Sequence, residues 1–190
     1  MTPSKDALRS QMRALRARLA AASPQAAEAL AAHLPAALLK PVTVAAYHPF
    51  RNEIDPGPLL DRFAAAGATL ALPVTPARDS SDGLTFRVWR DGADLKPGHF
   101  AVHEPHPDEP LADPDIVLAP LLAFDRTGAR LGYGAGHFDR TLADLRARKP
   151  VLYVGLAYAG QEVAGLPAEA HDQRLDAILT EKGYRAVRKD

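Results

Sequence analysis

The chain has 190 residues, of which 47% are hydrophobic, and its 23 lysines and arginines balance 23 aspartates and glutamates. This composition is that of a globular protein and excludes a disordered, collagen-like or coiled-coil chain. The formal charge of zero gives no overall field that would attract DNA, RNA or an anionic membrane, so we expect neither nucleic acid nor membrane as a partner. The lack of cysteine excludes disulfides, thiolate nucleophiles and cysteine-ligated metals.

The hydropathy of the sequence indicates neither a membrane span nor an export signal. The first twenty residues contain no apolar core of the kind that a signal peptide needs, and no run of about 18 apolar residues occurs. We therefore expect a soluble, cytoplasmic protein.

Two helices are predicted before the first strand. The first begins at Lys5, where Ser4 can act as N-cap, and its apolar positions recur at helical spacing: Leu8, Met12, Leu15 and Leu19. Ser23 and Pro24 make a cap and a first helical residue for a second, alanine-rich helix. We expect that helix to end near Pro35, because proline cannot donate within a helix.

A strand, a helix and another strand follow in succession. Residues 42–47 are short, apolar and β-branched, residues 59–66 form a helix that ends at Gly67, and residues 69–74 read as the next strand. This order is a βαβ unit and indicates a parallel sheet. Residues 84–89 alternate apolar and polar side chains, which predicts a strand with one solvated face.

The second half of the chain continues the alternation of strands and helices. Residues 91–114 show no sustained period and are predicted to form a long ordered loop. Buried strands are predicted at residues 115–124, 151–157 and 175–180, and a helix at residues 138–148. With no repeat and no dividing linker, residues 1–190 are predicted to form one α/β domain with three layers, a central and mostly parallel sheet flanked by helices.

Glycines are concentrated between a predicted strand and a predicted helix, since four of the 13 fall within residues 128–136. Glycine permits sharp turns and close approach of backbone N–H groups to a ligand, and this position is the usual anion site of α/β proteins. Arg130 and Arg140 flank the segment, and Asp139 lies in the first helical turn. Backbone donors, positive charge and a carboxylate together suit a magnesium-bound polyphosphate.

The glycine segment also has a purely structural interpretation, because a tight turn between a strand and a helix often serves packing alone. It fits neither standard nucleotide fingerprint: residues 132–136 read GxGxG and not GxGxxG, and no GxxxxGK[ST] occurs. A Rossmann dehydrogenase and a P-loop enzyme are therefore disfavoured.

The segment from Phe124 to Arg140, FDRTGARLGYGAGHFDR, resembles the signature of the 5-formyltetrahydrofolate cyclo-ligase family, also called 5,10-methenyltetrahydrofolate synthetases. Further blocks resemble the family in the same order along the chain: Lys5 with Arg9, residues 52–55, residues 100–105, and residues 161–176. The resemblance therefore extends from residue 5 to about residue 180.

The resemblance implies an enzyme that uses ATP and Mg²⁺ to convert 5-formyltetrahydrofolate into 5,10-methenyltetrahydrofolate, with release of ADP and phosphate. In the family mechanism the formyl oxygen attacks the γ-phosphorus, and the folate nitrogen N10 then closes the ring as phosphate leaves. We expect these two small molecules as partners and a monomeric protein. The alternative is a relative that keeps the fold and binds folate or nucleotide without turnover.

The resemblance also implies roles for individual residues. It assigns catalysis to Arg130 and Arg9, and the metal to Asp139 and Asp172, with Asp176 as the alternative to Asp172. It assigns ATP binding to Lys5, Arg9, Arg130, Gly132, Tyr133, Gly134, Ala135, Gly136, His137 and Phe138. It assigns folate binding to Glu53, Phe100, Tyr133 and His137.

Each of these assignments has a structural alternative. Lys5 and Arg9 could be solvated charges on a helix, Glu53 an ordinary surface glutamate, Arg130 a loop salt bridge, Asp139 a stabiliser of a helix N-terminus, and Phe100 a core residue. In addition, the family commonly has a Tyr-Tyr pair before the metal aspartate, where this chain has His137 and Phe138. Phe138 lacks the hydroxyl that a contact specific to the second tyrosine would need.

A different class of enzyme would be a metal hydrolase built on a histidine-rich segment. Its candidate ligands are His99, His103, Glu104 and His106, and the three histidines are separated by four and then three residues, as on one face of a helix. Pro105 and Pro107 oppose a continuous helix there, so the side chains are not expected to share one face.

Overall fold

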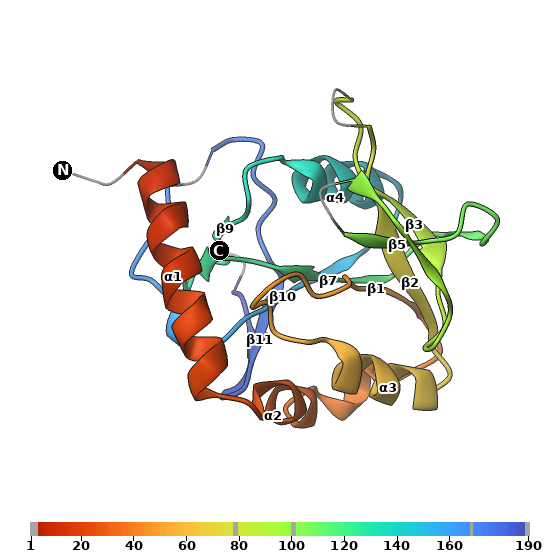
Figure 1. Ribbon diagram of the computed structural model, residues 1–190, viewed down its shortest axis with the longest axis horizontal. Coiled ribbons are helices and arrows are strands. Elements are labelled where there is room, and N and C mark those ends of the chain that lie inside the picture. Colours follow the sequence, from red (N-terminus) through yellow and green to blue (C-terminus); the bar gives the residue numbers. More distant parts are fainter. Residues whose placement is uncertain (1–3, 78–79, 100–101, 168, 189–190) are drawn as a thin grey trace.

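The computed structural model describes residues 4–77, 80–99, 102–167 and 169–188 (Figure 1). Its centre is a sheet whose eight strands lie in the order β12 (Gly183–Ala186), β11 (Ala177–Thr180), β10 (Leu152–Leu156), β7 (Ile116–Pro120), β1 (Thr43–Ala45), β2 (Thr69–Val74), β3 (Thr85–Val88) and β6 (Leu111–Ala112). The strands from β11 to β2 are parallel, whereas β12 and β3 join them antiparallel and β6 is antiparallel to β3. The predicted mostly parallel sheet is thus confirmed.

Helices lie on both faces of the sheet (Figure 1). The α-helices in the described ranges are α1 (Lys5–Ala22), α2 (Ala26–Ala32), α3 (Gly57–Ala65) and α4 (His137–Arg148). α2 and α3 cover one face, α4 covers the other, and α1 lies at one end of the molecule (Figure 1). Short 3₁₀ turns occur at η1 (Ala36–Leu38) and η3 (Ala159–Gln161). The three-layer α/β prediction is therefore confirmed.

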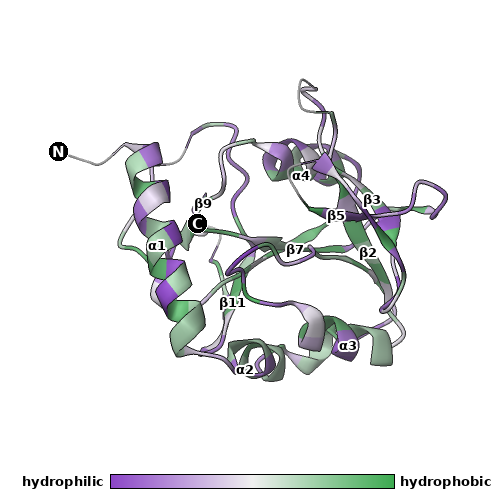
Figure 2. Cartoon of the chain, viewed as in Figure 1, coloured by the Kyte–Doolittle hydropathy of each residue, from purple (hydrophilic) through white to green (hydrophobic). Residues whose placement is uncertain are grey.

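Side chains alternate between the two faces of each strand, and they form one apolar core on each face of the sheet. Leu118 faces α2 and α3 in one apolar cluster, and its neighbour Val117 faces α4 in the other; Val154 and Tyr153 divide in the same way. Because parallel strands covered on both faces bury every side chain, they read as continuous apolar runs. β7 and β2 are accordingly coloured as hydrophobic in Figure 2.

The first helix forms where the sequence predicts it. The Ser4 hydroxyl accepts a hydrogen bond from the Ala7 N–H at 3.2 Å, which caps the free end of α1. Met12 packs in a third apolar cluster with Leu122, Ala123 and Leu131, so this helix lies against the segment that contains the glycines. The second helix begins at Ala26 and not at Pro24, because Ser23 ends α1 and its carbonyl accepts the Ala26 N–H.

Two predicted elements differ from the structure. The region 91–114, predicted as a loop, contains β4 (Leu95–Pro97), β5 (His103–Pro105) and β6. β4 and β5 pair with each other, and strands of two or three residues are too short to show a period. The single strand predicted over 115–124 is divided after Pro120, and β8 (Ala123–Phe124) turns away to pair with β9 (Arg130–Leu131).

The strand β12 was not predicted. Gly183, with φ of 151°, forms the tight turn that returns the chain antiparallel to β11. None of the helices in the described ranges has both the length and the apolar character that crossing a bilayer would require.

Candidate active site

The glycine segment forms a loop between β9 and α4 that lies against the first helix. Gly134 has φ of 105° and Gly136 has φ of 67°, conformations that side chains rarely adopt. A Cβ atom on Gly134 would lie 3.3 Å from Cζ of Arg9. Glycine is therefore required here both by backbone conformation and by the close approach of an arginine from α1.

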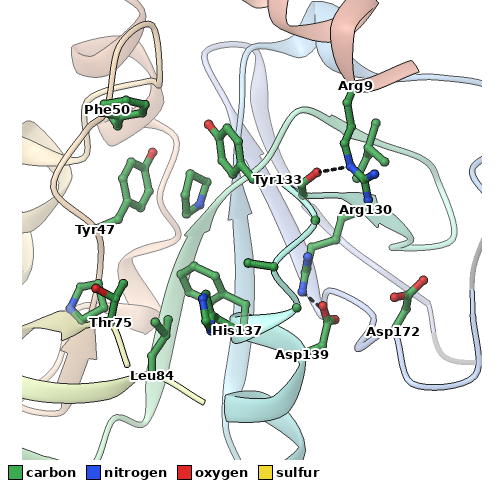
Figure 3. Close-up of a pocket in the computed structure, with 18 of the residues that line it drawn as sticks. Arg9, Tyr47, Phe50, Thr75, Leu84, Arg130, Tyr133, His137, Asp139 and Asp172 are labelled. Atoms are coloured by element: carbon green, nitrogen blue, oxygen red, sulfur yellow. Dashed lines mark hydrogen bonds and ion pairs between the residues drawn. The ribbon is translucent and has the colours of Figure 1, made fainter. Parts of the chain in front are cut away.

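This loop borders a cavity of about 640 Å³ at the carboxyl ends of the parallel strands, where α/β proteins bind ligands. The walls come from the start of α1, the segments after β1 and β2, the glycine loop, and residues 169–172. Every site residue predicted from the sequence lines this cavity, except Phe100, which lies outside the described residues. In Figure 3 the charged side chains Arg9, Arg130, Asp139 and Asp172 lie on one side.

The opposite side of the cavity is mainly aromatic and apolar. Figure 3 shows Tyr47, Phe50 and Leu84 there, with Tyr133 and His137 between this side and the charged one. The cavity can therefore hold a strongly anionic group at one end and a flat, apolar group at the other.

The basic residues at the start of α1 point into the cavity. Lys5 Nζ lies 2.6 Å from Glu169 Oε1 and 3.7 Å from Asp172 Oδ2. Arg9 donates from Nε to the carbonyl oxygen of Gly132 at 3.2 Å, and its side chain is 19% exposed. Arg9 thus lies beside the glycine loop and Lys5 beside residues 169–172, and both side chains line the cavity.

Arg130 and Asp139 form a nearly buried ion pair, with Nη2 and Oδ1 2.7 Å apart and side chains 8% and 13% exposed. Asp139 Oδ1 also accepts the backbone N–H of Gln173 at 2.9 Å. The Arg130 guanidinium lies 5.3 Å from the centre of the Tyr153 ring. Burial raises the pKa of Tyr153 to about 12, so this phenol is neutral beneath the guanidinium.

Glu53 is a buried carboxylate in the segment between β1 and α3. Its Oε2 accepts the backbone N–H of Phe50 at 2.9 Å, and its Oε1 accepts the hydroxyl of Tyr133. Burial raises the pKa of Glu53, and the hydrogen bonds from Tyr133 and Phe50 and the nearby Arg16 oppose that rise. Arg16 was missed in the sequence, although an arginine four residues after the buried Met12 lies on the same helical face.

The two aspartates that the sequence left as alternatives are clearly separated. Asp172 lines the cavity, where its Oδ2 accepts the backbone N–H of Glu169 at 2.8 Å. Asp176 is not among the lining residues, and its Oδ2 accepts hydrogen bonds from Arg146 and from the Tyr153 N–H. Among the described residues, no group of three or more histidines and carboxylates is arranged to hold a metal.

The carboxylates that face the cavity suit Mg²⁺. Both hydrogen bonds that Asp139 accepts go to Oδ1, and Asp139 and Asp172 are oxygen ligands facing the same cavity. Mg²⁺ typically takes one or two protein carboxylates and completes its shell with phosphate oxygens and water. The two aspartates therefore fit a magnesium ion that arrives with a polyphosphate.

The histidine-rich segment does not form the site of a metal hydrolase in the described residues. Glu104 is buried, and its Oε1 accepts both the N–H and the hydroxyl of Thr75. His106 pairs with Asp108 at 3.0 Å on the surface, and the ring of His103 lies 5.4 Å from that of His48. Glu104 thus links β5 to the end of β2, where Thr75 lines the cavity.

Residues 1–181 match the 5-formyltetrahydrofolate cyclo-ligase family. The chain belongs to this family. It is 37% identical over 171 residues to the 5-formyltetrahydrofolate cyclo-ligase of Mycolicibacterium smegmatis, which covers 85% of this chain and 86% of that protein. Over 142 residues it is 37% identical to the Escherichia coli protein of the same name, covering 73% and 77% of the two chains. The resemblance found in the sequence and the expected class of enzyme are confirmed.

Solved structures agree with this cyclo-ligase family assignment. The 5,10-methenyltetrahydrofolate synthetase of Aquifex aeolicus superposes with a TM-score of 0.73 at 30% identity, covering 98% of this chain and 94% of that chain. The synthetase from Mycoplasma pneumoniae gives the same TM-score at 22% identity and supports the fold.

His137 and Phe138 stand at the start of α4, where the resemblance led us to expect a Tyr-Tyr pair. Phe138 stacks on Tyr153, with ring centroids 6.5 Å apart, so its ring serves the core beneath Arg130. His137 lines the cavity, and its Nδ1 lies 3.0 Å from Nη2 of Arg140. Burial lowers the pKa of His137, which favours the neutral ring at neutral pH.

Proposed function

We propose that this protein is a 5-formyltetrahydrofolate cyclo-ligase that uses MgATP to form 5,10-methenyltetrahydrofolate, releasing ADP and phosphate. One observation carries the proposal: a single cavity has cations and a glycine loop at one end and a buried glutamate with aromatic rings at the other. Such a cavity suits two ligands that must react with each other, since holding both in one geometry removes much of the entropic barrier.

The charged end is proposed to bind ATP. Lys5, Arg9 and Arg130 supply positive charge for the phosphates, and the backbone of residues 132–138 supplies N–H donors at the N-terminus of α4. Asp139 and Asp172 would hold Mg²⁺, which supplies neutralisation of phosphate charge when it is bound.

The opposite end is proposed to bind the folate. The buried Glu53 carboxylate can accept hydrogen bonds from polar N–H groups of the substrate, and Tyr133 and His137 lie between the two ends of the cavity. Tyr47 and Phe50 offer ring faces for stacking. The folate contact predicted for Phe100 stays a prediction.

The chemistry of the proposed reaction explains why positive charge and correct positioning of the two substrates are sufficient for catalysis. An N-formyl group is an amide whose oxygen is too poor a leaving group to depart as water, so phosphorylation of that oxygen must precede ring closure by N10. Charge develops on the transferred phosphoryl group, and Arg9 and Arg130 are proposed to stabilise it from the edge of the glycine loop. The buried position of Arg130 strengthens this interaction, because water screens it less than it would an exposed charge.

The test is the absorbance of the methenyl product when purified protein meets 5-formyltetrahydrofolate, first without and then with MgATP. The proposal expects product only with MgATP and one ADP for each methenyl group formed. A folded protein that binds ATP and folate but forms no product would instead be a relative that binds without turnover.

A further inference from the structure

A buried arginine on α1, Arg16, contacts two residues that line the cavity, although it is not itself among the described residues that line it. Arg16 is 4% exposed, and it follows Arg9 by seven residues, so both side chains lie on one face of the helix. Nη1 of Arg16 donates to the hydroxyl of Tyr133 and lies 3.6 Å from Oε1 of Glu53. The Tyr133 hydroxyl in turn donates to the same oxygen of Glu53.

These contacts join three parts of the chain that are distant in sequence. Arg16 belongs to α1, Tyr133 to the glycine loop, and Glu53 to the segment after β1. The guanidinium also lies 5.5 Å from the centre of the Tyr133 ring, a cation–π distance. A buried guanidinium is costly unless it is paired, so this arrangement persists because each partner compensates another.

We propose that Arg16 is a positioning residue, whose guanidinium fixes the Glu53 carboxylate and the Tyr133 ring for substrate and thereby couples the two ends of the cavity through α1. The coupling follows from two contacts of the same helix with adjacent loop residues. Arg9 donates to the carbonyl oxygen of Gly132, and Arg16 donates to the side chain of Tyr133. A shift of α1 therefore moves the glycine loop and the glutamate together. The substrate role of Glu53 rests on the proposed function.

The charge on Glu53 depends on the groups that face it. Tyr133 approaches from the glycine loop, Arg16 from α1, and Tyr47 from the end of β1, where its hydroxyl donates to the Ile54 carbonyl at 2.6 Å. Asp55 and Tyr158 also act on this group of side chains. The hydrogen bonds from Tyr133 and Phe50 oppose the effect of burial on the pKa of Glu53, and so does the positive charge of Arg16.

The first experiment needs no turnover. The titration of the Glu53 side-chain carboxyl is followed by carbon NMR in the free protein, with Glu53→Gln used for assignment. Arg16→Met should move this titration to higher pH, because a neutral side chain no longer favours the ionised carboxylate. Arg13 is exposed on the same helix, so Arg13→Met is the matched control and should leave the titration unchanged.

The second experiment measures the dissociation constant of 5-formyltetrahydrofolate in a double-mutant cycle. Arg16→Met should weaken binding about tenfold to a hundredfold in the presence of Glu53, and hardly at all in the Glu53→Gln background. The loss should be larger at about pH 6 than at about pH 8.5, because the variant carries less ionised glutamate at low pH. Arg16→Lys should restore part of the affinity; it replaces Arg16→Met in the cycle if the methionine variant does not fold.

The outcomes separate the two proposals. Equal losses from Arg16→Met with and without Glu53, or an unchanged Glu53 titration, would overturn the role of Arg16. If Glu53→Gln binds folate as tightly as the wild type, the proposed substrate contact of Glu53 is wrong, and the NMR titration still decides whether Arg16 sets its charge.

Discussion

The guanidinium of Arg130 and the carboxylate of Asp139 contact each other at 2.7 Å, although one is proposed to bind phosphate and the other a metal ion. Both side chains are nearly buried, so each neutralises the other before any ligand is present. A polyphosphate with its cation brings charges of both signs to this pair. The ligand can therefore replace the internal pairing without leaving a buried charge uncompensated.

The first prediction concerns Arg130. Arg130→Ala should lower kcat about a hundredfold to a thousandfold, because it removes a buried donor aimed at developing charge. Arg126 lies in the same segment, is 85% exposed in its side chain, and pairs with Glu162. Arg126→Ala is the matched control and should retain its turnover. Near-normal turnover in a folded Arg130→Ala variant, checked by circular dichroism, would show that the arginine serves only the loop.

The second prediction concerns the metal. Asp139→Asn should raise the Mg²⁺ concentration needed for half-maximal activity, because an amide is a weaker ligand for this cation than a carboxylate. Asp144 is exposed on the same helix and provides the control Asp144→Asn. A magnesium titration of Asp139→Asn that coincides with that of the wild type would place the metal elsewhere.

Much of this site could be predicted because its residues lie in short, ordered motifs. The glycine loop and Asp139 are adjacent in sequence, and the βαβ order of the first half implies the sheet edge where they lie. Arg16 was not predicted, because only tertiary packing determines that an arginine of this arginine-rich helix meets Glu53 and Tyr133. The signal present in the sequence was that Arg16 follows Met12 by four residues and therefore lies on the apolar face of the helix.

The strands between residues 91 and 114 were missed for a related reason. β5 is fixed by the buried side chain of Glu104, which binds Thr75 at the end of β2, a contact between distant parts of the chain. A Cβ atom on Gly98 would lie 2.1 Å from the Glu104 carboxyl carbon, so this turn also depends on that packing. Local periodicity contains none of this information.

The third prediction concerns the dependence of stability on pH. Burial raises the pKa of Glu53 above its value in the unfolded chain, so the folded protein favours the protonated form. Its contribution to stability is therefore present below the ordinary glutamate pKa and is lost as pH rises through the raised pKa. The melting temperature of Glu53→Gln minus that of the wild type should become more positive across this window. Glu28→Gln, at an exposed position, should show no such trend.

The fourth prediction concerns the conformation of the glycine loop. Gly134→Ala should destabilise the protein by about 1–2 kcal/mol, because φ at this position is positive, and should raise the KM for ATP, because the new methyl group crowds Arg9. Gly165 has no heavy atom within 4 Å of a Cβ position, so Gly165→Ala is the control for both thermal melting and kinetics. An unchanged KM in Gly134→Ala would mean that Arg9 does not contact the nucleotide.

The fifth prediction separates ligand binding by Lys5 from its ion pairs. Lys5 Nζ contacts Glu169 at 2.6 Å, and Glu169 is 54% exposed in its side chain, so water screens this pair. Lys5→Ala should raise the KM for ATP with little change in melting temperature, because a phosphate contact is lost. Glu169→Ala breaks the same ion pair but leaves the ammonium group in the cavity, so its KM for ATP should not rise. Matching increases in KM for the two variants would show that Lys5 acts by holding the 169–172 segment and not by binding the nucleotide.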